Sequence, residues 1–153
     1  MLNLRRFCIT NDKNAVFMLP FSHKYRGTIY IISMNMKVKV AIVGTRTPKV
    51  NYSEWEKLLL AKISPDEISL VVSGGAQGID TYAKLFAGRH RIPLMEFLPD
   101  YAKYGKQAPL RRNTQIVKEA TTVIAFPSAE SRGTHHSIAE AQRLKKNVIV
   151  VRI

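Results

Sequence analysis

Three glycine-bearing segments follow strand-like runs and have the residue types of a phosphate-binding site. They are Gly44-Thr45-Arg46, then Ser73-Gly74-Gly75-Ala76-Gln77-Gly78-Ile79-Asp80, and then Pro127-Ser128-Ala129-Glu130-Ser131-Arg132-Gly133-Thr134. Glycine lets the backbone approach a ligand closely, and a helix N-terminus adds N–H donors and a partial positive charge. Arg46 or Arg132 would strengthen such an anion site. Glycine after a strand is also common turn punctuation, so the prediction depends on three such turns meeting at one edge of a sheet.

A fourth segment, Arg111-Arg112-Asn113-Thr114, opens a helix and offers two further kinds of contact. Arginine can hold a phosphate with two hydrogen bonds, and asparagine can pair with a base edge or a ribose hydroxyl. The competing interpretation is that Asn113 caps the helix and both arginines are solvated. Taken alone, the segment favours that second interpretation.

Asp80 and Glu140 each have more than one possible role. Asp80 would bind a ribose hydroxyl, act as a base, or stabilise the first turn of its helix, and the last role is slightly favoured. Glu140 either points into the site or pairs at the surface with Arg143 or Lys145, and the surface pair is favoured. If the protein is an enzyme, the candidate catalytic residues are Arg112, Glu140 and Asp80.

Other familiar site patterns are missing from the sequence. Neither G-x-G-x-x-G nor Gly-Lys-Ser/Thr nor G-x-S-x-G occurs. His135 and His136 are adjacent and therefore point in different directions on a helix, and Cys8 is the one cysteine. We expect no metal site and no cofactor.

The elements that must position these residues alternate along the chain. Strands are expected at residues 38–43, 68–72, 92–97, 121–126 and 147–151, and helices at 53–62, 78–89, 110–119 and 134–145. Ser53 is the expected N-cap of the first helix, and residues 99–109 are expected to form a loop. Alternating strands and helices predict an α/β fold, Rossmann-like and doubly wound, with a mainly parallel sheet of about five core strands. Ligands of such sheets bind beyond the carboxyl ends of the strands.

The first 35 residues do not follow this pattern. A turn at 22–27 and a β-like stretch at 28–32 precede residues 36–153, which are expected to form the nucleotide-binding domain. Residues 1–35 are either a gene-model extension, with Met34 or Met36 as the true start, or an irregular extension with a genuine extra strand.

Charge and hydropathy narrow the class of partner. Lys and Arg total 24 against 11 Asp and Glu, which gives a net charge of +13. That balance suits nucleotides or nucleic acid about as well as it suits a merely solvated surface. A single cysteine excludes an intramolecular disulfide framework, and no apolar stretch approaches the ~20 residues that span a membrane. We expect a cytoplasmic protein without a membrane partner.

These motifs, in this order, resemble the SLOG superfamily, which joins the bacterial DNA-processing protein A with the "lonely guy" cytokinin-activating phosphoribohydrolases. The resemblance covers residues 38–153. Within the superfamily the sequence is most similar to the stand-alone branch called YspA or cpYpsA-related. That similarity rests on the motifs Tyr104-Gly105-Lys106-Gln107-Ala108, Arg112-Asn113, Ala125-Phe126-Pro127 and Gly133-Thr134, besides the first two glycine segments.

The resemblance implies a Rossmann-like fold, binding of a nucleotide or nucleotide-derived signal, and a homo-oligomer. The phosphoribohydrolases carry Pro-Gly-Gly-x-Gly-Thr-x-x-Glu, whereas this chain has Ser137 at the place of the catalytic glutamate. The leading hypothesis is therefore a nucleotide-binding or sensor protein. The alternatives are a nucleoside 5′-monophosphate phosphoribohydrolase and a single-stranded DNA binder.

Overall fold

The computed structural model describes residues 8–11, 14–17, 33–34 and 37–153. The chain divides into two compact units, Met1–Met36 and Lys37–Ile153. The first unit contains β1 (Cys8–Asn11), β2 (Asn14–Phe17) and β3 (Ser33–Met34), joined as an antiparallel sheet in that order. The turn expected at 22–27 and the strand expected at 28–32 lie outside the described residues.

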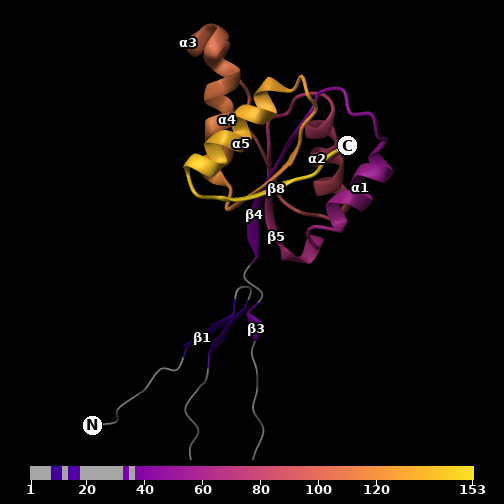
Figure 1. Cartoon of the computed structure of the whole chain (residues 1–153), viewed down its shortest axis with the longest axis vertical. Helices are drawn as coiled ribbons and strands as arrows, with labels where there is room; N and C mark the ends of the chain where they lie inside the picture. The colour runs from indigo at the N-terminus through magenta and orange to yellow at the C-terminus, as the bar shows by residue number, and fades with distance from the viewer. Residues whose placement is uncertain (1–7, 12–13, 18–32, 35–36) are drawn as a thin grey trace, which may run out of the picture. The chain divides into compact units, whose positions relative to one another are not determined.

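The second unit is built on a five-stranded parallel sheet (Figure 1). Its order is β6-β5-β4-β7-β8. The strands are β4 (Val38–Gly44), β5 (Ile68–Ser73), β6 (Leu94–Glu96), β7 (Thr122–Phe126) and β8 (Asn147–Val150). In the central strand, Ala41 lies opposite Val72 of β5 and Val123 of β7. The predicted Rossmann-like α/β fold is thereby confirmed.

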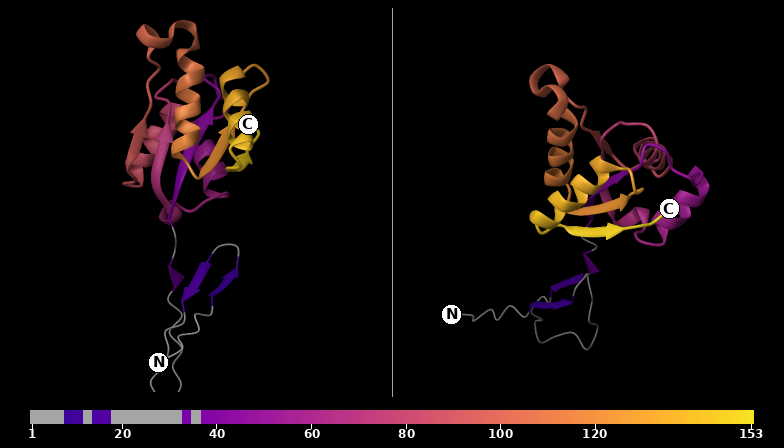
Figure 2. Two further views of the ribbon diagram at one scale, coloured as in Figure 1. Left: turned by 90° about the vertical axis from the view of Figure 1, so that its left-hand side faces the viewer. Right: turned by 45° about the horizontal axis from the view of Figure 1, so that its top comes forward.

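Helices cover both faces of this sheet (Figure 2). The helices α1 (Tyr52–Leu60) and α2 (Ile79–Arg89) pack on one face, and α4 (Ala108–Glu119) and α5 (Arg132–Arg143) pack on the other. Shorter helical turns are η1 (Pro65–Glu67), α3 (Tyr101–Tyr104) and η2 (Gly105–Gln107). Among the described residues, none of these helices is both long and apolar enough to cross a membrane.

Near-continuous apolar strands are the reason that both faces are covered. Along β4, Val40 and Ile42 join the cluster under α1 and α2, whereas Ala41 and Val43 join the cluster under α4 and α5. Trp55 of α1 is fully buried in the first cluster, with its ring 5.5 Å from that of Phe126. This packing fixes the ends of β4, β5 and β7, from which the glycine-bearing turns project.

Several boundaries differ from the sequence expectations, and the third strand of the sheet is shorter than expected, Leu94–Glu96 instead of 92–97. Asn51, not Ser53, is the N-cap of α1, because its side chain accepts from Glu54 N while Glu54 accepts from Asn51 N, at 3.0 Å each. The expected loop at 99–109 contains α3, whose Lys103 N donates to Asp100 Oδ1 at 3.0 Å. The last helix begins at Arg132, two residues before Thr134, where it was expected to start.

Candidate phosphate-binding site

A cavity of about 320 Å³ opens at the carboxyl edge of the sheet, between the ends of β4 and β7 and the first turns of α2, α4 and α5. We call it the first cavity. The predicted site residues that line it are Gly44, Thr45, Arg46, Ala76, Asp80, Arg112, Asn113, Ser131, Arg132, Gly133 and Thr134. All three glycine-bearing segments and the α4 segment therefore contribute to one space.

Other lining residues were not named individually as site residues. Ser128 and Glu130 lie within the third glycine-bearing segment, and the others are Val43, Thr47, Pro109, Ile116 and Ser137. Helical spacing carries a signal for two of them, because Pro109, Arg112, Asn113 and Ile116 fall on one face of α4. The predicted residues Ser73, Gly74, Gly75, Gly78 and Arg111 do not line this cavity, and Pro127 lines a neighbouring one.

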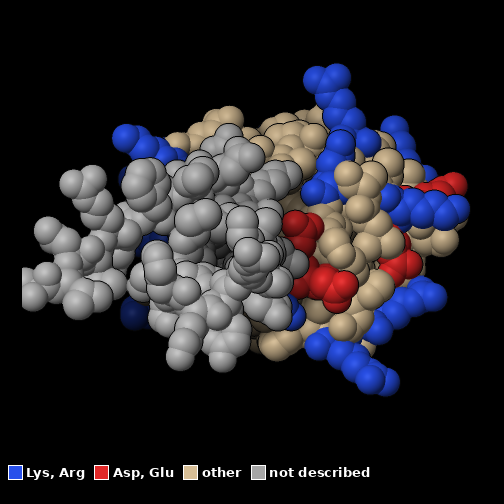
Figure 3. All heavy atoms as spheres, turned by 90° about the horizontal axis from the view of Figure 1, so that it is seen from below, with Lys and Arg blue, Asp and Glu red and all other residues tan. Residues whose placement is uncertain are grey.

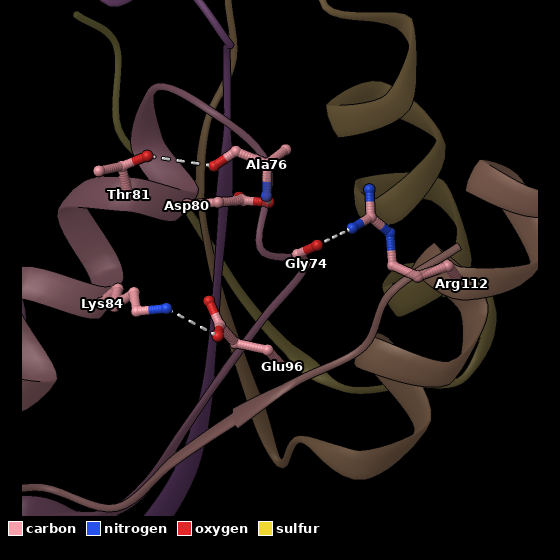
Figure 4. Close-up of polar contacts among 7 residues, drawn as sticks. All are labelled: Gly74, Ala76, Asp80, Thr81, Lys84, Glu96 and Arg112. Atoms are coloured by element: carbon pink, nitrogen blue, oxygen red, sulfur yellow. Dashed lines mark hydrogen bonds and ion pairs between the residues drawn. The ribbon is translucent and has the colours of Figure 1, made fainter. Parts of the chain in front are cut away.

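Arg112 is buried and donates hydrogen bonds to three acceptors within the protein. Its Nη1 donates to the carbonyl oxygen of Gly74 (Figure 4). The same Nη1 donates to Phe97 O at 3.2 Å, and Nε donates to Asn113 Oδ1 at 3.0 Å. Only 6% of Arg112 is exposed, so the interpretation of a solvated arginine is wrong for this residue. Arg112 therefore fixes the turn after β5 from the opposite side of the site.

Asn113 has a similar bracing role. It lies within α4 rather than at its N-cap, so the capping interpretation is also wrong. Its Nδ2 donates to Gly133 O at 3.1 Å. Together, adjacent residues of α4 connect the turn after β5 with the first turn of α5.

Asp80 stabilises the turn that leads into α2. Its Oδ2 accepts from Ala76 N at 3.1 Å, and Figure 4 shows the two residues side by side. Only 8% of Asp80 is exposed. Burial raises the pKa of Asp80 above its ordinary value, while the hydrogen bond from Ala76 and the charge of Arg112 act in the opposite direction. Asp80 also lines the first cavity, so it remains able to meet a ligand hydroxyl.

The raised pKa of Asp80 predicts a pH dependence of stability. The stability that the wild type holds over Asp80→Asn should be fully present below the unfolded carboxyl pKa of about 3.9, and should be lost as the pH rises through the raised folded value. Urea unfolding of both proteins across this range measures the difference. A difference that grows with pH would show that Arg112 and the hydrogen bonds outweigh burial.

Gly78 allows the turn after β5 to pass close to the end of β4. Its φ is +81°, and a Cβ there would lie 2.5 Å from the carbonyl oxygens of Thr45 and Arg46. The next residue, Ile79, donates its N–H to Thr45 O at 3.1 Å. The sequence suggested that Gly78 lets a ligand approach the backbone closely. In the structure it instead lets the backbone at the end of β4 approach the turn.

Hydroxyl groups connect the loop after β7 to the loop after β4. Ser128 Oγ donates to Thr45 Oγ1 at 3.1 Å, and Ser131 Oγ both donates to Ser128 O and accepts from Ser128 N at 2.8 Å. Thr47 N also donates to Thr45 Oγ1, at 3.3 Å. These bonds form a wall on one side of the first cavity, which we call the hydroxyl wall.

The first turn of α5 supplies the strongest features for an anion. Ser131 is the N-cap residue, and Arg132 and Gly133 both line the cavity. Within residues 37–153, the N–H of Gly133 donates to no backbone or side-chain acceptor. Arg46 and Arg132 are exposed side chains on the same cavity, so a helix N-terminus and two cations converge on it.

The candidate carboxylates are separated by the fold. Asp80 and Glu130 line the cavity, but Glu140 accepts from Arg143 Nε at 2.9 Å and from Arg143 Nη2 at 2.7 Å and lines no described cavity. Ser137 lines the cavity, and its Oγ donates to Gly133 O at 3.1 Å. Within the described residues, no group of three or more His, Cys, Asp or Glu side chains is placed to hold a metal ion.

Comparison with solved structures shows which known proteins share this fold. The chain superposes on DNA processing protein A from Helicobacter pylori with a TM-score of 0.58 and 24% identity, covering 76% of this chain and 66% of that one. For DNA processing protein A from Streptococcus pneumoniae the TM-score is 0.60 and the identity 22%, over 76% of this chain and 50% of that one. The structural-genomics target TM1055 gives a TM-score of 0.57 at 24% identity, over 74% and 72%. This chain therefore spans about two-thirds and half of the two DNA processing proteins.

Sequence comparison identifies the family. Residues 17–103 match the family described as DNA recombination-mediator protein A. Gene 61 protein of Mycobacterium phage D29 is 32% identical over 111 residues, which cover 69% of this chain and 89% of that protein. The chain belongs to the SLOG superfamily and, within it, to the DNA recombination-mediator protein A family.

Proposed function

We propose that this protein binds a nucleotide-type ligand, with the phosphate held in the first cavity at the N-terminus of α5. The observation that carries the proposal is the convergence of Gly133 N–H, Arg132 and Arg46 on one cavity. Each feature favours an anion, and a phosphate can accept from all of them at once. The cavity volume of about 320 Å³ is at the small end for ligand pockets and suits a mononucleotide portion.

The placement of the carboxylates near the first cavity favours a protein that binds a nucleotide over one that hydrolyses it. A phosphoribohydrolase needs a carboxylate beside the N-glycosidic bond, and the residue at the family position is Ser137, whose hydroxyl is bonded to Gly133 O. Glu140 is paired with Arg143. Of the carboxylates that the sequence offered as candidates, Asp80 is left, and it is engaged by Ala76 N. Glu130 also lines the cavity, but it is an exposed side chain on the loop after β7. Incubation with AMP that releases free adenine would overturn the preference for binding.

A thermal-shift and calorimetric screen tests the proposal. AMP, GMP and ADP-ribose are the probes, and one of them at a hundred times its Kd should stabilise the protein by about 2.7 kcal/mol. The variant Arg46→Ala/Arg132→Ala should lower the affinity of that probe about tenfold or more, because two charge-assisted contacts are removed. Absence of stabilisation by every probe would contradict the proposal.

A matched control distinguishes the effect of Arg46 and Arg132 on affinity from the effect of the protein's net charge. Lys57→Ala/Lys118→Ala removes the same two charges from exposed helical positions that line no described cavity. This control should bind the probe as the wild type does. An equal loss in both variants would show that the protein attracts nucleotides only through its overall charge.

Single-stranded DNA is the second candidate ligand. The family membership favours it, as does the description of a single-stranded DNA binding mode for the Helicobacter pylori protein. On this chain, the exposed ring of Tyr104 lies 5.1 Å from Lys103 Nζ and 5.9 Å from Arg111 Cζ, a combination that can stack on a base and attract its phosphate. Basic side chains are dispersed around the face that Figure 3 shows rather than joined in one continuous track.

Salt titration distinguishes the two candidates. A strand held along several cations should lose affinity for an oligonucleotide steeply as salt rises, and Tyr104→Ala should weaken it by about 1–3 kcal/mol. The same variant should leave mononucleotide affinity unchanged. If an oligonucleotide is not retained even at low salt, the DNA-binding alternative is excluded.

A further inference from the structure

A second cavity, of about 480 Å³, lies on the other side of the hydroxyl wall. It shares Thr45, Thr47, Ser128 and Glu130 with the first cavity. Its remaining walls include Lys49, His135 and Arg152. Because four residues line both spaces, a ligand that lies over the wall can occupy both at once.

The second cavity is also suited to an anion. Lys49 and Arg152 are exposed, and neither forms an ion pair within the part of the chain that the structure describes. His135 Nε2 lies 3.0 Å from Ser128 O, and because a carbonyl only accepts, this ring nitrogen carries the proton. Each cavity therefore presents two exposed basic side chains, Arg46 and Arg132 in the first and Lys49 and Arg152 in the second.

The wall between them has the groups that recognise a sugar. Thr45 Oγ1 accepts from Ser128 Oγ and from Thr47 N, so its own hydroxyl proton is free to be donated to a ligand. Glu130, an exposed carboxylate that lines both cavities, is an acceptor for hydroxyl groups and repels phosphate. A hydroxylated, uncharged group fits over the wall better than a continuous polyphosphate chain.

We propose that the ligand is a free nucleotide that carries phosphates on opposite sides of one ribose, as in a nucleoside 3′,5′-bisphosphate. One phosphate occupies the first cavity and the other meets Lys49 and Arg152 in the second, while the ribose lies over the hydroxyl wall. This inference rests on the proposed function, since it takes the phosphate site in the first cavity as given. It adds the ligand class and a second binding site.

Isothermal titration with three adenine nucleotides tests the inference. Adenosine 3′,5′-bisphosphate and ADP carry the same number of phosphates, but both phosphates of ADP lie on one side of the ribose, and AMP carries one. The bisphosphate should bind about tenfold more tightly than either, which is the gain that a second charge-assisted contact gives. Equal binding of the bisphosphate and ADP would overturn the inference and leave the proposed function standing.

The variant Lys49→Ala/Arg152→Ala should abolish the advantage of the bisphosphate and leave AMP affinity unchanged. Lys57→Ala/Lys118→Ala, with the same loss of charge, should keep the advantage. A bisphosphate preference that survives Lys49→Ala/Arg152→Ala would overturn the assignment of the second cavity. Failure of all three nucleotides to bind would overturn the proposed function itself. A 5′-phosphorylated dinucleotide that binds more tightly than the bisphosphate would overturn the assignment to a free small molecule.

Discussion

Arg112→Ala is expected to lower the free energy of unfolding by about 3–5 kcal/mol, the range for breaking a buried charged network. The variant leaves the carbonyl oxygens of Gly74 and Phe97 and Asn113 Oδ1 without their donor. It also removes a positive charge that favours the ionised form of the buried Asp80. Urea unfolding monitored by far-UV circular dichroism and by Trp55 fluorescence measures the loss. The large effect follows from burial, since 6% of Arg112 is exposed.

Arg111→Ala is the matched control. Arg111 precedes Arg112 on α4, and its substitution removes the same charge. Unlike Arg112, it is exposed, and its guanidinium lies 5.9 Å from the centroid of the Tyr104 ring. It should change stability by no more than about 0.5 kcal/mol. Similar losses in the two variants would contradict a specific bracing role for Arg112. Combining Arg112→Ala with Asp80→Asn should recover part of the loss, because no uncompensated carboxylate is then buried.

Gly78→Ala is expected to cost about 3 kcal/mol or more. The residue has φ +81° and ψ −126°, a conformation that L-residues strongly disfavour, and the added Cβ would meet two backbone carbonyl oxygens at 2.5 Å. A backbone cannot move aside as a flexible side chain can. Because those carbonyls belong to Thr45 and Arg46, which line the first cavity, nucleotide affinity should fall along with stability.

The same substitution within α2, the helix that follows Gly78, provides the comparison. Gly88 of α2 is exposed, and an added Cβ would meet nothing within 4 Å. Gly88→Ala should stabilise the protein by about 0.5–1 kcal/mol, because alanine is the better helix former. If Gly78→Ala were tolerated as well as Gly88→Ala, the close approach of the turn to β4 would not be an essential contact.

Much of the fold was predictable because its signals are local. The Val- and Ile-rich runs at β4, β5, β7 and β8 identify buried strands, and the helical segments between them require parallel connections. Parallel strands bring their carboxyl ends to one edge, so the meeting of Gly44, Asp80 and Gly133 around one cavity also followed from element order.

The remaining features depend on contacts between distant segments, which the sequence does not encode locally. From the sequence alone the segment that contains Arg112 favours a solvated arginine, because Gly74, whose carbonyl oxygen accepts from it, is 38 residues away. The same holds for the pairing of Ser128 with Thr45, separated by 83 residues. Short α3 was missed because four residues are too few to show a helical period.

The strand order has a consequence for synthesis on the ribosome. Strand β4 is made before β5, β6 and β7, yet it lies at the centre of the sheet, between β5 and β7. Until residues 122–126 emerge, the β7-facing side of residues 40–44 has no hydrogen-bonding partner strand. We therefore expect the nascent chain to pass through a stage with an open, Val- and Ile-rich edge that is susceptible to aggregation and is a natural substrate for chaperones.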